Sequence, residues 1–431
     1  MNPNSLCVLL WSIIIFLAQS FPAHAAGSAD SLPPLPPPYL TPLAGDPYST
    51  IFMGEELSIP AQNRGHVTAL TLGGTFYTPK QGNTAGSPIA ALYLKRAGET
   101  SRSRSMISIF VNDLEYDRSF GNFELISRFE NNTVPGGQEE IVSNKSLTDS
   151  SVEWGTIFAS IGPGLRYKIS PYQIDNDIRL QLLGRIGYFY AKKTDDTSPS
   201  YLLPTSTMLY GVKLRGRIDG IRRNILELPH RGVAGGFDIE YIHRYNWNDF
   251  GSTASGGHIF KASDTMNYVQ SSFYLLGVTP IPGLSERDVI LAGIYIGMMD
   301  THQADRYNAF RIGGGPLPGE TDDLYRVDYP GTMFNSILVS RYAMTNIEYR
   351  RELAFFMYLH LRGSFIWAQQ ALISSTNGLS SGSRNGQAIT TGIDSGFFWD
   401  SSLYLDYSWD SGFIRNGKPG NGIILSWNKA F

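Results

Sequence analysis

The chain has 431 residues with 35 basic and 38 acidic side chains, and its net charge of -3 excludes the strongly basic surface of a nucleic-acid-binding protein. Aromatic residues at 13%, together with 45 glycines, favour strands over helices. After the N-terminal segment, no run of residues approaches the ~18 apolar residues of a membrane-spanning helix. The chain therefore either is soluble or crosses a bilayer as strands.

Residues 1–25 are predicted to be an export signal. Leu6–Leu17 form an apolar core of signal-peptide length, and Ala23-His24-Ala25 is a small-residue cleavage site that would leave Ala26 as the mature terminus. The only cysteine, Cys7, lies in this segment without a lipid-attachment motif before it. We therefore expect the mature chain to have no disulfide, no thiol nucleophile and no lipid anchor.

Residues 26–64 form a proline-rich lead that contains the run LPPLPPPYLTP. Such a composition predicts an extended segment that does not fold by itself. Residues 65–431 are expected to form one domain.

Apolar and polar residues alternate with a period of two through this domain, which predicts half-buried strands. In Leu403–Asp410, Leu403, Leu405, Tyr407 and Trp409 share one face, and Asp406 lies on the other. Four more segments alternate in the same way: Ile178–Tyr190, Tyr210–Asp219, Phe237–Tyr245 and Phe355–Trp367. Counting such stretches from about Thr68 to Phe431 predicts an all-β protein, a transmembrane antiparallel β-barrel of about 16 strands of the outer-membrane type.

A soluble β-sandwich is the alternative, in which the charged face of each strand would point to water. The strands exceed the usual ~5 to 6 residues, and aromatic residues recur at the ends of their apolar faces, as in membrane girdles. In the barrel, the charged residues of the middle strands point into the lumen. The predicted inward set is Arg179, Arg185, Lys213, Arg215, Arg217, Asp238, Glu240, Glu348, Arg350, Arg362 and Asp406.

The connections near the C-terminus alternate in length, as the short periplasmic turns and long outer loops of such barrels do. Short turns are predicted at Pro282–Asp288, Arg351–Ala354 and Asp400–Ser402. Long loops are predicted at Asp300 to about Gly331, Gln369–Gln387 and Asp410–Asn421.

The longest of these loops carries the most specific motif, Phe310-Arg311-Ile312-Gly313-Gly314. It precedes a strand, Ile337–Arg350, that ends in Asn346-Ile347-Glu348-Tyr349-Arg350, and the chain ends on Phe431. Pro229-His230-Arg231-Gly232 stands before the Phe237 strand. In order and spacing these features resemble the BamA-like superfamily of bacterial surface-antigen barrels, in which an F-R-x-G-G segment enters loop six and N-x-E-Y-R ends the twelfth strand.

The resemblance implies residence in the outer membrane of a Gram-negative type of cell and a role in inserting or translocating proteins or lipids there. Its implied partners are outer-membrane lipids, the assembly machinery that reads the last strand through Trp427 and Phe431, and client proteins or lipids. In the family, insertion works through a weak lateral seam between the first and last strands. The lead is too short for a POTRA module, so the chain resembles the POTRA-less branch. A passive pore or transporter with loop six as its constriction is the alternative.

Three departures from the family limit what the resemblance implies. The tip of loop six reads Leu317-Pro318-Gly319-Glu320, with Pro318 where the family has an arginine, and the thirteenth strand reads Phe365-Ile366-Trp367 where the family offers a carboxylate. Both halves of the family's ion pair between loop six and the wall are thus missing. Arg311 or Arg326 could replace it with Glu348 as acceptor, and we predict the pair Arg311–Glu348, with Arg350 and Arg362 as further candidate lumen partners. In the last strand, Ser426 stands where a glycine is usual, and Lys429 occupies the penultimate outward position.

Catalytic and metal sites receive little support. Gly378-Leu379-Ser380-Ser381-Gly382 matches G-x-S-x-G, but a nucleophile elbow needs a strand before it and a helix after it, whereas this segment reads as a loop. His360 is predicted to be a hydrogen-bonded wall residue near Arg362. The acidic run Glu320–Asp323, with Asp328 beyond it, could bind Ca²⁺ but reads more simply as a solvated loop. We expect no enzymatic activity, no cofactor and no metal, with a barrel hydrolase as the third and least favoured function.

Overall fold

The computed structural model describes residues 40–431 except 53, 62, 80–84, 110, 143–144, 170–175, 254–256, 314–323, 325, 333–336, 374–378, 397–400 and 414–417. The predicted signal peptide, Pro318 and the acidic run of loop six lie outside the described residues.

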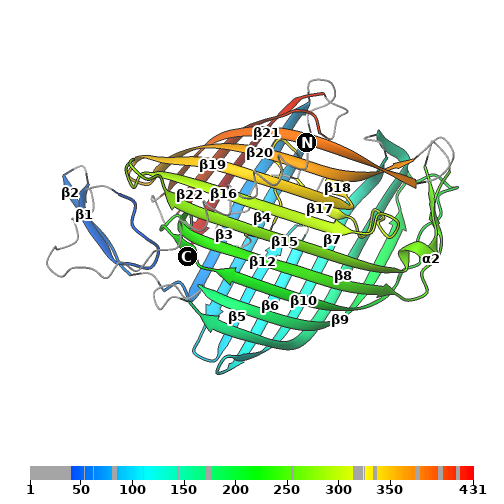
Figure 1. Ribbon diagram of the computed structural model, residues 1–431, viewed down its shortest axis with the longest axis horizontal. Helices are drawn as coiled ribbons and strands as arrows, with labels where there is room; N and C mark the ends of the chain where they lie inside the picture. The colour runs from blue at the N-terminus through cyan, green and yellow to red at the C-terminus, as the bar shows by residue number, and fades with distance from the viewer. Residues whose placement is uncertain are drawn as a thin grey trace.

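Sixteen long antiparallel strands form one closed barrel (Figure 1). Each strand pairs with the next, and β23 returns to β3 through a register that runs from Gly420 opposite Pro79 to Ala430 opposite Ala69. The strands are β3 (His66–Pro79), β4 (Ala85–Ala97), β5 (Ser101–Ser108), β6 (Val111–Phe120), β7 (Phe123–Val142), β8 (Lys145–Lys168), β9 (Asp177–Lys193), β10 (Thr207–Asp219), β12 (Pro229–Arg244), β15 (Asn267–Pro280), β16 (Asp288–Met299), β19 (Arg341–Ala354), β20 (Met357–Ile373), β21 (Leu379–Gly396), β22 (Ser401–Asp410) and β23 (Gly420–Ala430).

Short elements decorate the two ends of the barrel. The hairpin of β1 (Tyr48–Phe52) and β2 (Glu55–Ile59) lies beyond one end, and the helix α2 (Ala262–Thr265) lies at the other (Figure 1). Five more short strands are described. β11 (Arg222–Arg223) pairs with β12, β13 (Phe250–Gly251) pairs with β14 (Ile259–Phe260), and β17 (Phe310–Ile312) pairs with β18 (Ile337–Val339). Among the described residues, no helix combines the length and the apolar character needed to cross a membrane.

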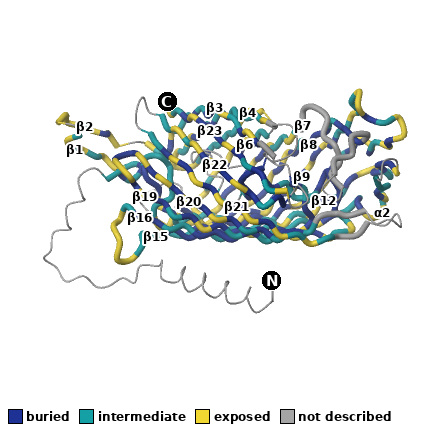
Figure 2. The backbone as a smooth tube through the Cα atoms, turned by 90° about the horizontal axis from the view of Figure 1, so that it is seen from above, coloured by how far each residue is buried: buried dark blue, intermediate teal, exposed yellow. Residues whose placement is uncertain are grey.

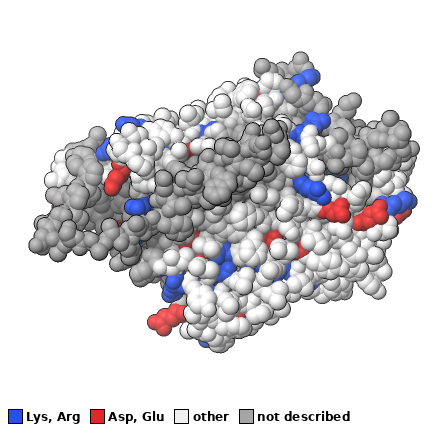
Figure 3. Space-filling view, viewed as in Figure 1, with Lys and Arg blue, Asp and Glu red and all other residues white. Residues whose placement is uncertain are grey.

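Alternate residues of the strands face the lumen and the outside, and this confirms the predicted phase. Leu405 is 41% exposed, whereas the adjacent Asp406 is 2% exposed. Figure 2 shows buried and exposed residues alternating along the strands, and uncharged atoms predominate among the described residues on the face in Figure 3. The outward positions carry large apolar side chains, including Leu180, Leu182, Ile186, Tyr188, Tyr210, Val212, Ile239, Tyr241, Leu403, Tyr407 and Ile423. A closed barrel with such a belt is a membrane-spanning barrel, because lipid requires apolar side chains outside and a paired backbone throughout.

The predicted phase is wrong at Phe355. Phe355 and Phe356 form the two-residue turn between β19 and β20, and both are buried instead of facing lipid. They pack against Tyr48 and Phe52 of the β1–β2 hairpin, with ring centroids of Phe355 5.9 and 5.4 Å from those of Tyr48 and Phe52. The turn therefore begins four residues later than predicted, since the apolar pattern continues past the membrane into a small core at the rim.

The N-terminal lead also differs from the prediction, because residues 48–59 form a hairpin. Thr41 fixes the start of this segment by donating two hydrogen bonds to Glu352 Oε1, from its backbone N at 2.8 Å and its Oγ1 at 2.9 Å. The described part of the lead, from residue 40 on, thus docks on the end of β19.

Two predicted strand boundaries also differ from the structure, because the observed strand pairing differs from the predicted one. Ile337–Val339 pair with β17 inside loop six, so the twelfth barrel strand begins at Arg341. Most of the predicted loop Gln369–Gln387 is strand, since β20 runs to Ile373 and β21 begins at Leu379. Ser380 lies within β21, opposite Leu372, and so lacks the strand-turn-helix setting of a nucleophile elbow.

Candidate functional site

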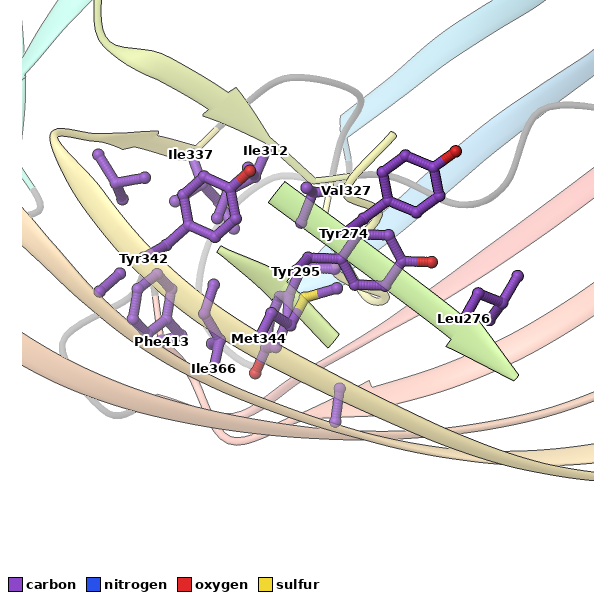
Figure 4. Packing of buried hydrophobic residues seen from close by; sticks show 14 of the residues in the cluster. Tyr274, Leu276, Tyr295, Ile312, Val327, Ile337, Tyr342, Met344, Ile366 and Phe413 are labelled. Atoms are coloured by element: carbon purple, nitrogen blue, oxygen red, sulfur yellow. The ribbon is translucent and has the colours of Figure 1, made fainter. Parts of the chain in front are cut away.

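Loop six, residues 300–340 between the eleventh and twelfth barrel strands, folds inward. Its residues Ile312, Val327, Tyr329, Ile337 and Val339 are buried in a single apolar cluster with side chains of the barrel wall. The wall contributes Tyr274, Leu276, Tyr295, Tyr342, Met344, Ile366, Ala368, Ala388 and, beyond β22, Phe413 (Figure 4). Burial of this many apolar side chains holds the loop inside the barrel.

The first part of loop six is anchored by a buried ion pair. Asp305 binds the guanidinium of Arg244 on β12 and accepts hydrogen bonds from the backbone N of Tyr307 at 2.7 Å and of Asn308 at 3.1 Å. Arg244 also lies 4.2 Å above the ring of Trp247. Tyr307 completes an aromatic cluster with Trp154, Phe189, Trp247 and Phe250. This cluster packs the loops together at the end of the barrel opposite the β1–β2 hairpin.

The later part of loop six reaches across to the C-terminal strands. Asp328 accepts a hydrogen bond from Nη1 of Arg362 on β20, with Oδ2 2.9 Å away. Three residues on, Gly331 adopts a φ of +74°, and a Cβ there would come within 2.9 Å of Asp410 on β22. A side chain at this position would be strained and crowded, so glycine allows the loop to approach the wall.

The Asp328–Arg362 pair, which we call the loop-six latch, reverses the polarity that the family resemblance implied. There, an arginine of the loop meets a carboxylate of the thirteenth strand; here, a carboxylate of the loop meets an arginine of β20, which is the thirteenth barrel strand. An ion pair of opposite polarity thus joins loop six to the thirteenth strand.

The predicted pair of Arg311 with Glu348 is wrong. Arg311 lies near Trp154, with its guanidinium 4.5 Å from the ring, and donates to the carbonyl oxygen of Arg306 at 2.8 Å. Burial, followed by the charge of Arg306, lowers the pKa of Arg311. Glu348 binds Arg350, its neighbour on the same face of β19, at 2.5 Å. Arg311 and Glu348 therefore have different partners and do not pair with each other.

The other residues of the loop-six motif hold the backbone of the small β17–β18 sheet. Phe310 packs edge-on against Tyr342 at 5.3 Å, and Gly313 has a φ of +122° with its N donating to the carbonyl oxygen of Val327 at 3.5 Å. Gly314 lies outside the described residues. Sequence reasoning missed Asp305 and Asp328 as anchors of the loop, because no local pattern reveals a partner on a distant strand.

The inward side chains of β5 to β12 form a network of ion pairs across the lumen. Arg215 on β10 reaches Glu115 on β6 at 2.8 Å, although three strands separate them along the wall. Arg185 on β9 binds Glu130 on β7 at 2.7 Å and also binds Glu240 on β12. The cationic sector predicted on the middle strands is therefore matched by carboxylates from other strands of the same part of the wall.

His360 faces the lumen beside the loop-six latch, as predicted for a hydrogen-bonded wall residue. Its Nδ1 lies 3.0 Å from Oδ2 of Asp394 on β21, and its Nε2 lies 2.5 Å from Oδ1 of Asp406 on β22. Arg362 Nη2 is 4.0 Å from Oδ2 of the same Asp406. The histidine cluster and the latch thus share one carboxylate.

The last strand presents its aromatic residues outward. Trp427 is 37% and Phe431 71% exposed, and Lys429 Nζ lies 5.4 Å from the ring of Phe431. Phe431 N donates to the carbonyl oxygen of Thr68 at 2.8 Å, which ties the terminus to the start of β3. The role of these aromatic residues in assembly stays a prediction.

Comparison with known proteins places this fold. No protein-family model and no curated protein matches the chain. Its structure is similar to CdiB from Acinetobacter baumannii, with a TM-score of 0.51 and 11% identity over 90% of this chain and 65% of that chain. It is similar to BamA from Haemophilus ducreyi lacking POTRA domains 1-3, with a TM-score of 0.50 and 9% identity over 90% of this chain and 75% of that chain. The chain thus spans about two thirds of the CdiB length, and at such low identity the likeness is one of fold.

Proposed function

The chain is an outer-membrane β-barrel with the BamA-like fold, and from this premise we propose that it inserts or translocates proteins or lipids at the outer membrane, with loop six as a displaceable plug. The observation that carries the proposal is loop six itself, which packs against the inner wall and crosses to β20 and β22. A passive pore needs a permanently open, water-filled path through the lumen. A plug held by an apolar cluster and two ion pairs, Asp305–Arg244 and the latch, suits a barrel that opens during a working cycle.

The seam between β3 and β23 is the second element of the proposal. It is paired along its length, so opening it breaks a ladder of backbone hydrogen bonds. A Cβ on Gly73 would come within 2.2 Å of the carbonyl oxygen of Leu425, so the two strands approach closely only because β3 carries glycine there. An edge exposed by opening could pair with a client strand.

A disulfide across the seam tests the proposal. Thr71 and Asn428 are register partners that face the lumen, with Oγ1 and Oδ1 3.1 Å apart, and the only natural cysteine is Cys7. The variant T71C/N428C would close the seam covalently. The matched control N346C/S364C places the same bond between β19 and β20, at inward register partners away from the seam.

The measurement is the folding of a urea-unfolded eight-stranded barrel into vesicles that hold the oxidised or reduced variant. We expect oxidation of T71C/N428C to slow client folding by about tenfold or more, and reduction to restore it, with the control unaffected. If neither variant nor the wild type accelerates client folding, but all conduct KCl equally, the chain is a pore instead.

A further inference from the structure

His360 has a hydrogen-bonding arrangement that requires a stored proton. The side chain is 3% exposed, and each ring nitrogen faces a carboxylate oxygen, of Asp394 at 3.0 Å and of Asp406 at 2.5 Å. A neutral imidazole carries one N–H and one lone pair, so it can donate to only one of the two. Both contacts are favourable only when the cluster holds an additional proton, which makes the ring an imidazolium.

The backbone leaves room for this arrangement at one position. A Cβ on Gly392 of β21 would lie 1.9 Å from Asp406 Oδ1 and 2.6 Å from His360 Nε2. Any larger residue there would push the histidine and the aspartate apart. The short contact between them therefore depends on a glycine on a third strand.

We propose that His360, as a protonated positioning residue, holds Asp406 away from Arg362 and so keeps the loop-six latch closed. Arg362 stands between two carboxylates, with Asp328 of the loop at 2.9 Å and Asp406 of the wall at 4.0 Å. Asp406 is occupied by His360 through Oδ1 and by the Tyr404 hydroxyl through Oδ2. While His360 and Tyr404 bind Asp406, Arg362 pairs with Asp328.

Charged and titratable groups face His360 from every neighbouring strand. Glu348 and Arg350 of β19 bind each other at 2.5 Å. The remaining groups are Arg362 on β20, Asp394 on β21, Tyr404 and Asp406 on β22, and Asp328 of loop six with Arg326 near it. With a neutral ring this site would hold four carboxylates against three guanidinium groups, and with an imidazolium it holds four against four cations. The proton thus reduces an unfavourable excess of negative charge in a buried place.

Loss of the proton releases the loop by a defined exchange of partners. The ring then keeps its proton on Nδ1, where it donates to Asp394, and Nε2 presents its lone pair to Asp406, so that contact becomes repulsive. Asp406, freed from the ring, turns to Arg362 and competes with Asp328. Loop six then loses its latch, and the apolar cluster holds its later part while the Asp305–Arg244 pair still anchors its first part.

The experiment records KCl conductance of the full barrel in planar bilayers between about pH 6 and about pH 10.5. We expect the wild type to stay closed at the acid end and to open with rising pH, the open fraction growing by about tenfold or more, as for loss of one charge-assisted hydrogen bond. His360→Gln, whose two N–H donors share one nitrogen and so cannot replace donors on the two separate ring nitrogens, should be open throughout.

Asp394→Asn is the matched variant that separates the proton from the packing. An amide at this position can donate to Nδ1 of a neutral ring or accept from a charged one, so His360 can hold Asp406 in either state. This variant should stay closed across the whole range. A pH profile of Asp394→Asn that matches the wild type, or a closed His360→Gln, would overturn the proposal.

A second readout follows the loop directly. The labelling rate of V327C in loop six, divided by that of T100C in the exposed turn before β5, cancels the pH dependence of the thiol itself. The ratio should rise with pH in the wild-type background and remain low in Asp394→Asn, and heat-modifiable migration confirms that each variant is folded. The inference rests on the proposed function only in treating loop six as a plug. No client is needed, so failure of the client-folding assay and failure of the pH profile are separate results.

Discussion

The two halves of the lumen are filled by different physical means. In the charged half, lined by β5 to β12, side chains of the wall bind each other across the lumen, as Arg215 binds Glu115. In the plugged half, lined by β15 to β23, a loop fills the space through an apolar cluster and the Asp328–Arg362 latch. Wall-to-wall ion pairs stay with the barrel, whereas a loop can leave. The comparison locates the moving part of the molecule in the plugged half.

The largest effect is expected from removing the centre of the charged half. Glu115 lies between 2.8 and 3.9 Å from five arginines, which are Arg102, Arg104, Arg128, Arg179 and Arg215. Glu115→Ala leaves buried cations without their shared carboxylate and should lower the free energy of unfolding by about 3 to 5 kcal/mol. Urea unfolding in vesicles measures this change.

An exposed pair provides the control for this variant. Lys261 and Asp249 form an ion pair at 2.7 Å with side chains 61% and 42% exposed. Lys261→Ala should change the unfolding free energy by only about 0 to 1 kcal/mol. Equal effects of the two substitutions would mean that the charged half is open to water and not a closed network.

The next effect concerns the outer wall, where the two halves should not differ. Leu180 on β9 and Leu405 on β22 face outward, 44% and 41% exposed. Leu180→Arg and Leu405→Arg should each cost about 2 to 4 kcal/mol, because lipid surrounds both halves alike. Unfolding in vesicles should give similar costs, and a tolerated arginine at one site would show that its strand does not face the bilayer core.

A smaller effect is expected from the latch. Asp328→Ala and Arg362→Ala should each weaken the hold on loop six by about 1.5 to 3 kcal/mol, seen as raised conductance with only a modest change in the unfolding of the barrel. The reversed pair D328R/R362D restores the polarity of the family arrangement and should recover closure. Single variants that match the wild type in conductance would show that the apolar cluster and the Asp305–Arg244 pair hold the loop without the latch.

The smallest effect tests that cluster. Val327 of loop six is 8% exposed, and Val327→Ala removes two methyl groups from the packed face. We expect about 1 to 2 kcal/mol less packing energy, which should raise the labelling or conductance of the loop without altering urea unfolding of the barrel. A drop in barrel stability of the same size would mean that loop six is an integral part of the wall and does not move separately.

The sequence by itself determined the architecture of the barrel, because the relevant pattern is local. Alternation in a strand assigns each residue to lipid or lumen without knowledge of its neighbours, so Leu405 and Asp406 could be placed correctly. The strand number, the position of loop six before the twelfth strand and the inward direction of Glu348 and Arg362 follow from the same pattern. The Phe355 error marks its limit, since an aromatic residue at a rim can also face protein.

Tertiary structure decided which charges meet. Arg311 and Glu348 had suitable charges, but closure of the barrel and the path of loop six brought Asp328 to Arg362 and left Arg311 beside Trp154. Likewise, β20 and β21 continue through a segment whose glycine and serine content indicates a loop, because each strand supplies the other's hydrogen-bond partners. Contacts across a lumen join residues far apart in the chain, and they depend on strand tilt and register around the whole barrel, which no local pattern records.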